Sequence, residues 1–114
     1  MSDLEILYRA KEFLCRDKFP GLSIQLIATD APVAYFFPRS DLSTIVVFIK
    51  SDKSGYRVSL FQMFHEAGHF VQYMKTGSEF SDIINEPAGT ERAEFEKQAW
   101  KEGAELLEEF LGLI

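Results

Sequence analysis

Five consecutive residues near the middle of the chain, His65-Glu66-Ala67-Gly68-His69, have the residue types and the spacing of a metal site. With about 3.6 residues per helical turn, side chains four positions apart lie one above the other, so His65 and His69 can bind the same ion. Glu66 lies beside them, where a carboxylate can take a proton from a metal-bound water. These are the only two histidines in the chain. The pattern predicts a Zn²⁺ site of the kind that peptidases use.

The third ligand of this predicted metal site is expected to be a carboxylate. Catalytic zinc usually has three protein ligands and leaves its fourth position to water. The chain contains no third histidine, and Cys15, its only cysteine, is far from the histidines in sequence. On the predicted last helix, Glu96 is the one acid in a row of apolar or small residues spaced three or four apart. Burial of a lone carboxylate is costly, and a metal ion compensates it best, so we predict Glu96 as the third ligand.

Other acids, and another role for Glu96, stay open on the sequence alone. Glu96 could instead form a salt bridge with Arg57 or Arg92 at the edge of the core. Glu91 stands in the first turn of the predicted helix, where the helix dipole already favours an acid. Glu94 shares its side of the helix with charged residues and is expected to face water. Glu91 and Glu94 are therefore the less favoured ligands.

Two further residues of the predicted motif helix have expected roles beside the site. Tyr73 is four residues after His69 and so lies on nearly the same face. It could orient a ligand or stabilise an oxyanion, although a tyrosine at the edge of the core is the commoner outcome, and we do not predict it as catalytic. Gly68 costs roughly 1 kcal/mol in a helix relative to alanine. Its presence predicts that another helix packs closely beside the metal.

The length and composition of the chain limit the classes of protein to which it can belong. Its 114 residues, 46% hydrophobic, fit a single globular domain over 1–114. The net charge of −6 and the scattered basic residues argue against direct binding of nucleic acid. The acidic start lacks the pattern of a signal peptide, and no apolar run approaches the ~18 residues of a membrane span. With one cysteine, a reduced cytoplasmic setting is expected, and the oligomeric state stays open.

Hydrophobic periodicity and turn residues predict an α+β domain. A capping box at Ser2 and Glu5 begins a first helix, Gly77 ends the motif helix, and Thr90 is expected to cap the last helix. The segment 78–89 has no clear period and is expected to be a surface loop that could cover a cleft. The predicted order is a helix at about 3–16, strands at 22–26, 33–37 and 44–49, the motif helix at 58–75, the loop, and a last helix to about 111.

These residues resemble the ImmA/IrrE family of zinc peptidases. Members carry a strand, a turn, an HExxH helix, a loop, and a helix with a Glu-x-x-Ala signature followed by small residues and Leu-Leu. The corresponding stretches here are 44–49, His65–His69, Glu96–Ala99 and Ala104–Leu107, within a match over about 42 to 108. The chain departs from the pattern at Trp100, where members commonly carry Asn. The resemblance implies a small zincin-like, gluzincin-type fold, zinc bound by His65, His69 and Glu96, and Glu66 as general base.

The combined prediction is a zinc-dependent endopeptidase that hydrolyses a peptide bond in one specific intracellular protein. The resemblance implies a helix-turn-helix repressor or an antitoxin-like regulator as that substrate. An extended peptide would pair with an exposed edge strand, for which 33–37 and 44–49 are both candidates. The alternative is a non-catalytic zinc-binding regulatory module of the same fold. The metal itself is also inferred, because Fe²⁺ or Mn²⁺ can occupy a site of two histidines and one carboxylate.

Overall fold

The computed structural model describes residues 2–50, 55–77, 79–85 and 89–114, and it is an α+β fold built on a three-stranded mixed sheet. The first helix, α1 (Asp3–Glu12), continues into a π-helical segment, η1 (Phe13–Lys18). The backbone N–H of Glu5 donates to Ser2 Oγ at 3.2 Å, and the Ser2 hydroxyl donates to Glu5 Oε1 at 3.3 Å. The predicted first helix and its cap are therefore confirmed.

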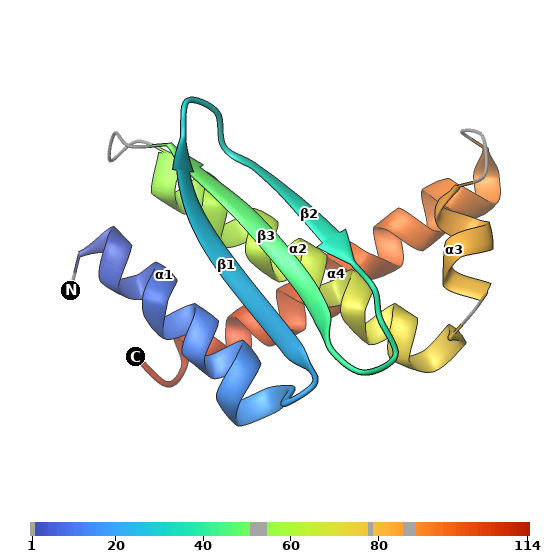
Figure 1. Cartoon of the computed structure of the whole chain (residues 1–114), viewed down its shortest axis with the longest axis horizontal. Helices are drawn as coiled ribbons and strands as arrows, with labels where there is room; N and C mark the ends of the chain where they lie inside the picture. The colour runs from blue at the N-terminus through green and yellow to red at the C-terminus, as the bar shows by residue number, and fades with distance from the viewer. Residues whose placement is uncertain (1, 51–54, 78, 86–88) are drawn as a thin grey trace.

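The sheet contains β1 (Leu22–Thr29), β2 (Val33–Phe37) and β3 (Ser43–Lys50) in the order β1-β3-β2. β1 runs parallel to β3, and β2 runs antiparallel to β3. All three predicted strands are confirmed, and the open question of the edge strand is answered. β2 lies at the edge of the sheet, whereas β3 lies in its centre and has no free edge for a peptide (Figure 1).

One face of the sheet packs against the motif helix, α2 (Tyr56–Thr76), which passes behind the strands in Figure 1. The residue pattern of the central strand, β3, explains this packing. Its inward-facing side chains are buried and alternate with half-buried ones along the whole strand. The inward positions are Ser43, Ile45, Val47 and Ile49. α2 ends as predicted at Gly77, whose φ of 59° is a conformation that glycine adopts without steric cost.

The last helix, α4 (Thr90–Leu111), crosses behind α2 and contacts it extensively (Figure 1). Two glycines allow the close crossing. A Cβ on Gly68 of α2 would lie 2.0 Å from the carbonyl oxygen of Ala99, and a Cβ on Gly103 of α4 would lie 2.3 Å from that of Phe64. The close helix packing predicted from Gly68 is confirmed.

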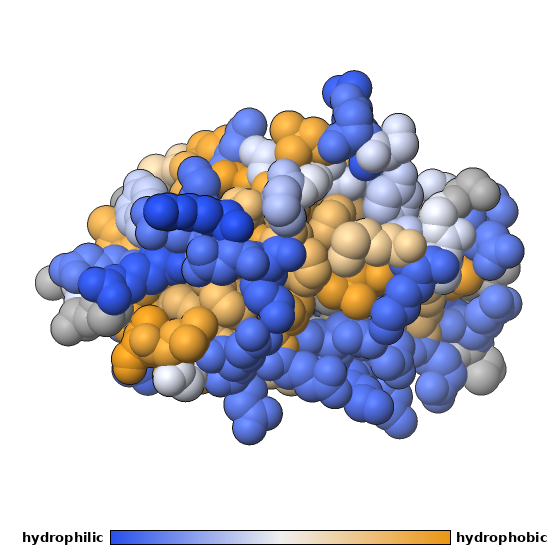
Figure 2. Space-filling view, turned by 90° about the horizontal axis from the view of Figure 1, so that it is seen from below, coloured by the Kyte–Doolittle hydropathy of each residue, from blue (hydrophilic) through white to orange (hydrophobic). Residues whose placement is uncertain are grey.

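Aromatic side chains complete the core at the same crossing. The ring centroids of Phe13 and Phe110 are 5.6 Å apart, and those of Phe64 and Phe110 are 5.7 Å apart. Phe13, the first residue of η1, thereby packs against α4, and its ring centroid is also 6.5 Å from that of Phe64 on α2. The side of α4 that faces away from α2 is hydrophilic, as the lower middle and right of Figure 2 show. Within the described residues, no helix has the length and apolar character needed to cross a membrane.

The structure differs from the sequence predictions in the segment after α2. The stretch 78–89 is not simply a loop, because it contains a short helix, α3 (Glu79–Ile84). Phe80 is 3% exposed and anchors this helix, with its ring centroid 5.5 Å from those of Phe36 and Phe95. Tertiary contacts therefore stabilise a helix too short to show a period. Thr90 is also not the cap: it is the first helical residue, and Gly89 occupies the N-cap position.

The backbone contact between α2 and α4 can be tested with Gly103→Ala. In an ordinary helix this change stabilises by about 0.5–1 kcal/mol. Here the new methyl group meets the Phe64 carbonyl, so we expect destabilisation by roughly 1–3 kcal/mol or more, measured by urea denaturation. Gly21→Ala is the matched control, because a Cβ on Gly21 meets no atom within 4 Å. A Gly103→Ala protein at least as stable as the wild type would contradict the close contact.

Candidate metal centre and active site

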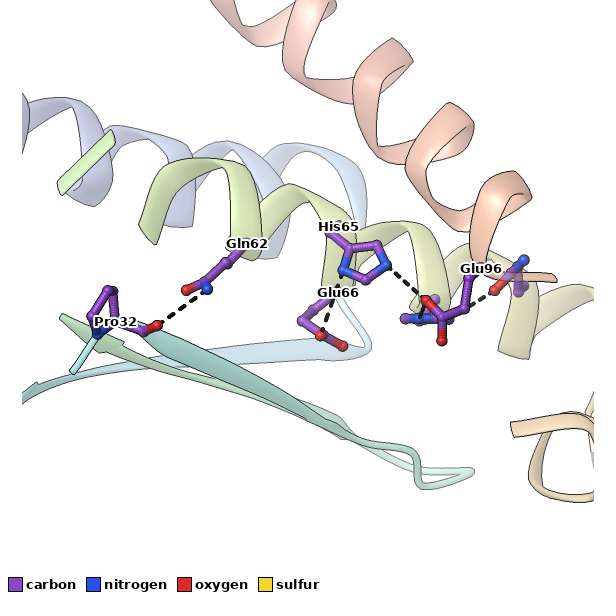
Figure 3. Close-up of polar contacts among 7 residues, drawn as sticks. Pro32, Gln62, His65, Glu66 and Glu96 are labelled. Carbon is purple, nitrogen blue, oxygen red and sulfur yellow. Dashed lines mark hydrogen bonds and ion pairs between the residues drawn. The ribbon is translucent and has the colours of Figure 1, made fainter. Parts of the chain in front are cut away.

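Three side chains from two helices converge on one point. His65 and His69 lie one turn apart on α2, and Glu96 extends towards them from the first half of α4 (Figure 3 labels His65 and Glu96). Glu96 Oε2 is 3.1 Å from His65 Nε2 and 3.2 Å from His69 Nε2. Donor atoms of the three residues all lie within 4.8 Å of one another, so the group could hold a metal ion.

The hydrogen bonds around His69 show that this arrangement fits a cation. The amide nitrogen of Gln72 donates to the carbonyl oxygen of Phe95 at 2.7 Å, which turns the amide oxygen towards the imidazole. His69 Nδ1 lies 2.8 Å from that oxygen and must donate to it. In the neutral ring, Nε2 then has a lone pair directed at the Glu96 carboxylate. Two acceptors 3.2 Å apart repel each other unless a proton or a metal ion lies between them.

Two of the three separations between the possible ligand atoms agree with the geometry of a tetrahedral site. Zinc binds imidazole nitrogen and carboxylate oxygen at about 2.0–2.2 Å, so two such ligands in a tetrahedral site lie roughly 3.3 Å apart. The two nitrogen–oxygen distances at Glu96 are close to that value. Burial and the neighbouring His69 also lower the pKa of His65, which favours the neutral ring that a metal requires.

Glu66 lies at the edge of the three-residue group. Its Oε1 is 3.9 Å from His65 Nδ1, and its side chain is only 15% exposed. Burial, and then the nearby Glu96 carboxylate, raise the pKa of Glu66 to about 8. The carboxyl group that the motif predicts as a base is therefore next to the predicted ligands and in a partly water-excluded setting.

A cleft of about 490 Å³ opens over these residues. Its floor contains His65, Glu66, His69 and Glu96. The edge strand β2 and the short helix α3 line its two sides, the first through Ala34, Tyr35 and Phe36 and the second through Phe80, Ser81 and Ile84. The possible metal ligands and Glu66 are thus reachable from a cleft that has a strand edge along one side.

The structure places the residues that were considered as alternatives on the sequence alone. Glu91 and Glu94 are exposed, and neither belongs to the converging group. Arg57 is exposed on α2, and Arg92 lines the cleft. The side chain of Tyr73 packs edge-on against Phe36 and Phe80 in an aromatic cluster, at centroid distances of 6.2 and 5.9 Å. Tyr73 thus has the packing of a residue at the edge of the core.

Two neighbours of the histidines were not predicted from the sequence as parts of the site. Gln72 holds His69 through the hydrogen bond described above, and Trp100 stacks on His65 with a centroid distance of 4.0 Å and an interplanar angle of 4°. The sequence feature that could have identified Gln72 is its spacing. It lies three residues after His69, and the residues next to it are mostly apolar. Trp100 lies four residues after Glu96 on α4, and it is 49% exposed although its indole stacks on His65.

Metal binding by this group is expected to depend on Glu96. Glu96→Gln removes the charge that balances the cation, so the affinity for Zn²⁺ should fall by roughly 100-fold or more, beyond the loss typical of an outer-shell change. Competition with a chromophoric chelator measures this affinity. Glu94→Gln, on the exposed side of the same helix, should bind Zn²⁺ like the wild type. Full zinc occupancy in the Glu96→Gln protein would remove Glu96 from the ligand set.

The buried carboxyl group of Glu66 should make stability depend on pH in the metal-free protein. Its pKa of about 8 exceeds the ordinary 4.5, so the stability that it contributes is complete below about pH 4.5 and is lost as the pH rises to 8. With chelator present, Glu66→Gln should therefore raise Tm above the wild type by roughly 5 °C or more at pH 8, and hardly at all near pH 4. Glu94→Gln serves as the exposed control. An equal difference at both pH values would contradict a neutral, buried Glu66.

Comparisons with known proteins do not name a family. No protein-family model, no curated protein and no solved structure matches this chain. The resemblance to the ImmA/IrrE peptidases stays a prediction that depends on the motifs. The geometry of His65, Glu66, His69 and Glu96 is consequently the main support for any function.

Proposed function

We propose that this chain is a zinc-dependent endopeptidase of the HExxH type, with a small zincin-like fold. The proposed ligands are His65, His69 and Glu96, and the proposed general base is Glu66. The observation that carries the proposal is the position of Glu96 Oε2, 3.1 and 3.2 Å from the two imidazole nitrogens, on the floor of a cleft that Glu66 also lines. Two histidines and one glutamate are a known ligand set of zinc peptidases.

The roles in hydrolysis follow from the chemistry of these residues. A bound Zn²⁺ supplies Lewis-acid polarisation of a carbonyl group and lowers the pKa of water. Glu66, as a carboxylate, takes the proton of the attacking water, and as a carboxylic acid it delivers this proton to the leaving amine.

The proposed substrate is an extended segment of one specific intracellular protein. β2 supports this proposal, because it is an edge strand and its residues Ala34, Tyr35 and Phe36 line the cleft beside Glu66. A peptide that pairs with the free edge of β2 would be held by main-chain hydrogen bonds next to the proposed ligands. β3 is no longer a candidate because strands flank it on both sides. A helix-turn-helix repressor or antitoxin-like regulator in the cytoplasm is the substrate class that the resemblance to ImmA/IrrE peptidases implies.

Glu66→Gln tests the proposed mechanism. The variant keeps the three ligands and loses the proton acceptor, so cleavage of the partner should slow by about 100-fold or more while zinc content is unchanged. Candidate helix-turn-helix repressors are co-expressed with each variant, and fragments are identified by mass spectrometry. Glu94→Gln is the control and should cleave normally. Cleavage that survives in Glu66→Gln would disprove the mechanism, and stoichiometric zinc without cleavage of any candidate by the wild type would favour the non-catalytic module.

A further inference from the structure

We propose that Gln72 is a positioning residue, which sets the tautomer of His69 and holds the Glu96 segment of α4 against α2. This inference rests on the proposed metal site and deepens it. Gln72 follows His69 by three residues, so the two side chains lie on the same face of α2 one turn apart. Its side chain is 5% exposed, and both ends of its amide group have partners.

The direction of the Gln72 amide is determined by its partner on α4. A main-chain carbonyl can only accept a hydrogen bond, so the group that contacts Phe95 O at 2.7 Å must be the amide NH₂. The amide oxygen therefore faces His69 Nδ1 at 2.8 Å, and the imidazole must donate there. A reversed amide would place two acceptors, its own oxygen and the carbonyl oxygen of Phe95, 2.7 Å apart.

The first consequence concerns the ring of His69. Neutral imidazole in water prefers its proton on Nε2, which is the nitrogen that faces Glu96 here. The Gln72 oxygen instead stabilises the proton on Nδ1 and leaves the lone pair of Nε2 directed at the place where the ligands converge. A histidine ligand oriented in this way binds a metal without first moving its proton.

The second consequence concerns Glu96. Phe95, whose carbonyl accepts the Gln72 hydrogen bond, is the residue directly before Glu96 on α4. One buried side chain on α2 therefore bonds to one proposed ligand and to the main chain beside another. Loss of Gln72 should consequently disturb both His69 and the distance between the helices at Glu96.

His65 provides an internal comparison because other residues hold it. Its ring is covered by Trp100 at a centroid distance of 4.0 Å, and its Nδ1 lies 3.9 Å from Glu66 Oε1. Among the described residues, no hydrogen bond joins Gln72 to His65. Replacement of Gln72 should therefore change the tautomer of the His69 ring directly, whereas it can reach His65 only through Glu96, which both imidazoles contact.

The test measures tautomers and zinc affinity, neither of which requires catalysis. Nitrogen-15 NMR of the metal-free protein at pH 8 distinguishes the protonated from the unprotonated ring nitrogen, and His65→Ala assigns the two histidines. We expect His69 to carry its proton on Nδ1 in the wild type. In Gln72→Leu it should revert to Nε2, and the affinity for Zn²⁺ should fall about 10–100-fold. Gln72→Met is the second variant and should behave like Gln72→Leu.

The matched control is Gln62→Leu. Gln62 lies on the same helix, and its amide also donates to a distant carbonyl, Pro32 O at 3.2 Å, but within the described part of the chain no hydrogen bond joins it to either histidine (Figure 3). This variant should keep the wild-type tautomer and zinc affinity. Gln72→Glu retains an acceptor for His69 Nδ1 and should keep the Nδ1 tautomer, with an affinity above that of Gln72→Leu.

Two results would overturn the inference. One is a wild-type spectrum in which His69 carries its proton on Nε2. The other is a folded Gln72→Leu protein with the wild-type tautomer and affinity. Failure of the proposed peptidase activity is a separate outcome, because the ring tautomer and the zinc affinity are measured without any substrate.

Discussion

The site depends on one close contact, the crossing of α2 and α4 at which the backbone of each helix touches the other. Gly68 faces the carbonyl of Ala99, and Gly103 faces that of Phe64, so neither position has room for a methyl group. Glu96 and His65 lie within about two turns of these contacts on their own helices. A side chain at either glycine would separate the helices, and Glu96 Oε2 would then no longer lie near 3 Å from both imidazoles. The ligand geometry is thus a product of helix packing rather than of the motif alone.

The crossing of α2 and α4 also brings acidic side chains and imidazole rings close together, and their mutual repulsion has to be compensated. Two carboxyl groups, Glu66 and Glu96, share a cleft with two imidazoles, and burial raises the pKa of Glu66 to about 8. The hydrogen bond from His69 Nδ1 to Gln72 leaves a lone pair on His69 Nε2, and this lone pair repels the Glu96 carboxylate. A divalent cation would relieve these unfavourable interactions together, because it attracts both carboxylates and both ring nitrogens. In its absence, a proton on Glu66 is the available means of lowering the repulsion between the two acids.

Much of this arrangement could be predicted from the sequence because it depends on local periodicity. The spacing of His65 and His69 and the single acid in an otherwise apolar row of α4 identified the converging residues, and Gly68 indicated the close helix contact. The short helix α3 could not be found in this way, since Phe80 is anchored by rings from distant parts of the chain. The choice of β2 as the edge strand also depends on long-range pairing, because both candidate strands have the same kind of composition. The role of Gln72 becomes visible only when its partner on α4 is known.

The elements that carry the proposed chemistry are distinct from those that form the sides of the cleft. His65, Glu66 and His69 lie on α2 and Glu96 on α4, two long helices in backbone contact. The sides come from β2, which has a free edge, and from α3, which is held mainly by one buried phenylalanine. Substitutions on β2 and α3 can therefore change which peptide fits while the ligands keep their positions. If the chain is a peptidase for one partner, its selectivity should depend on these two elements, whereas metal affinity should depend on the helix crossing.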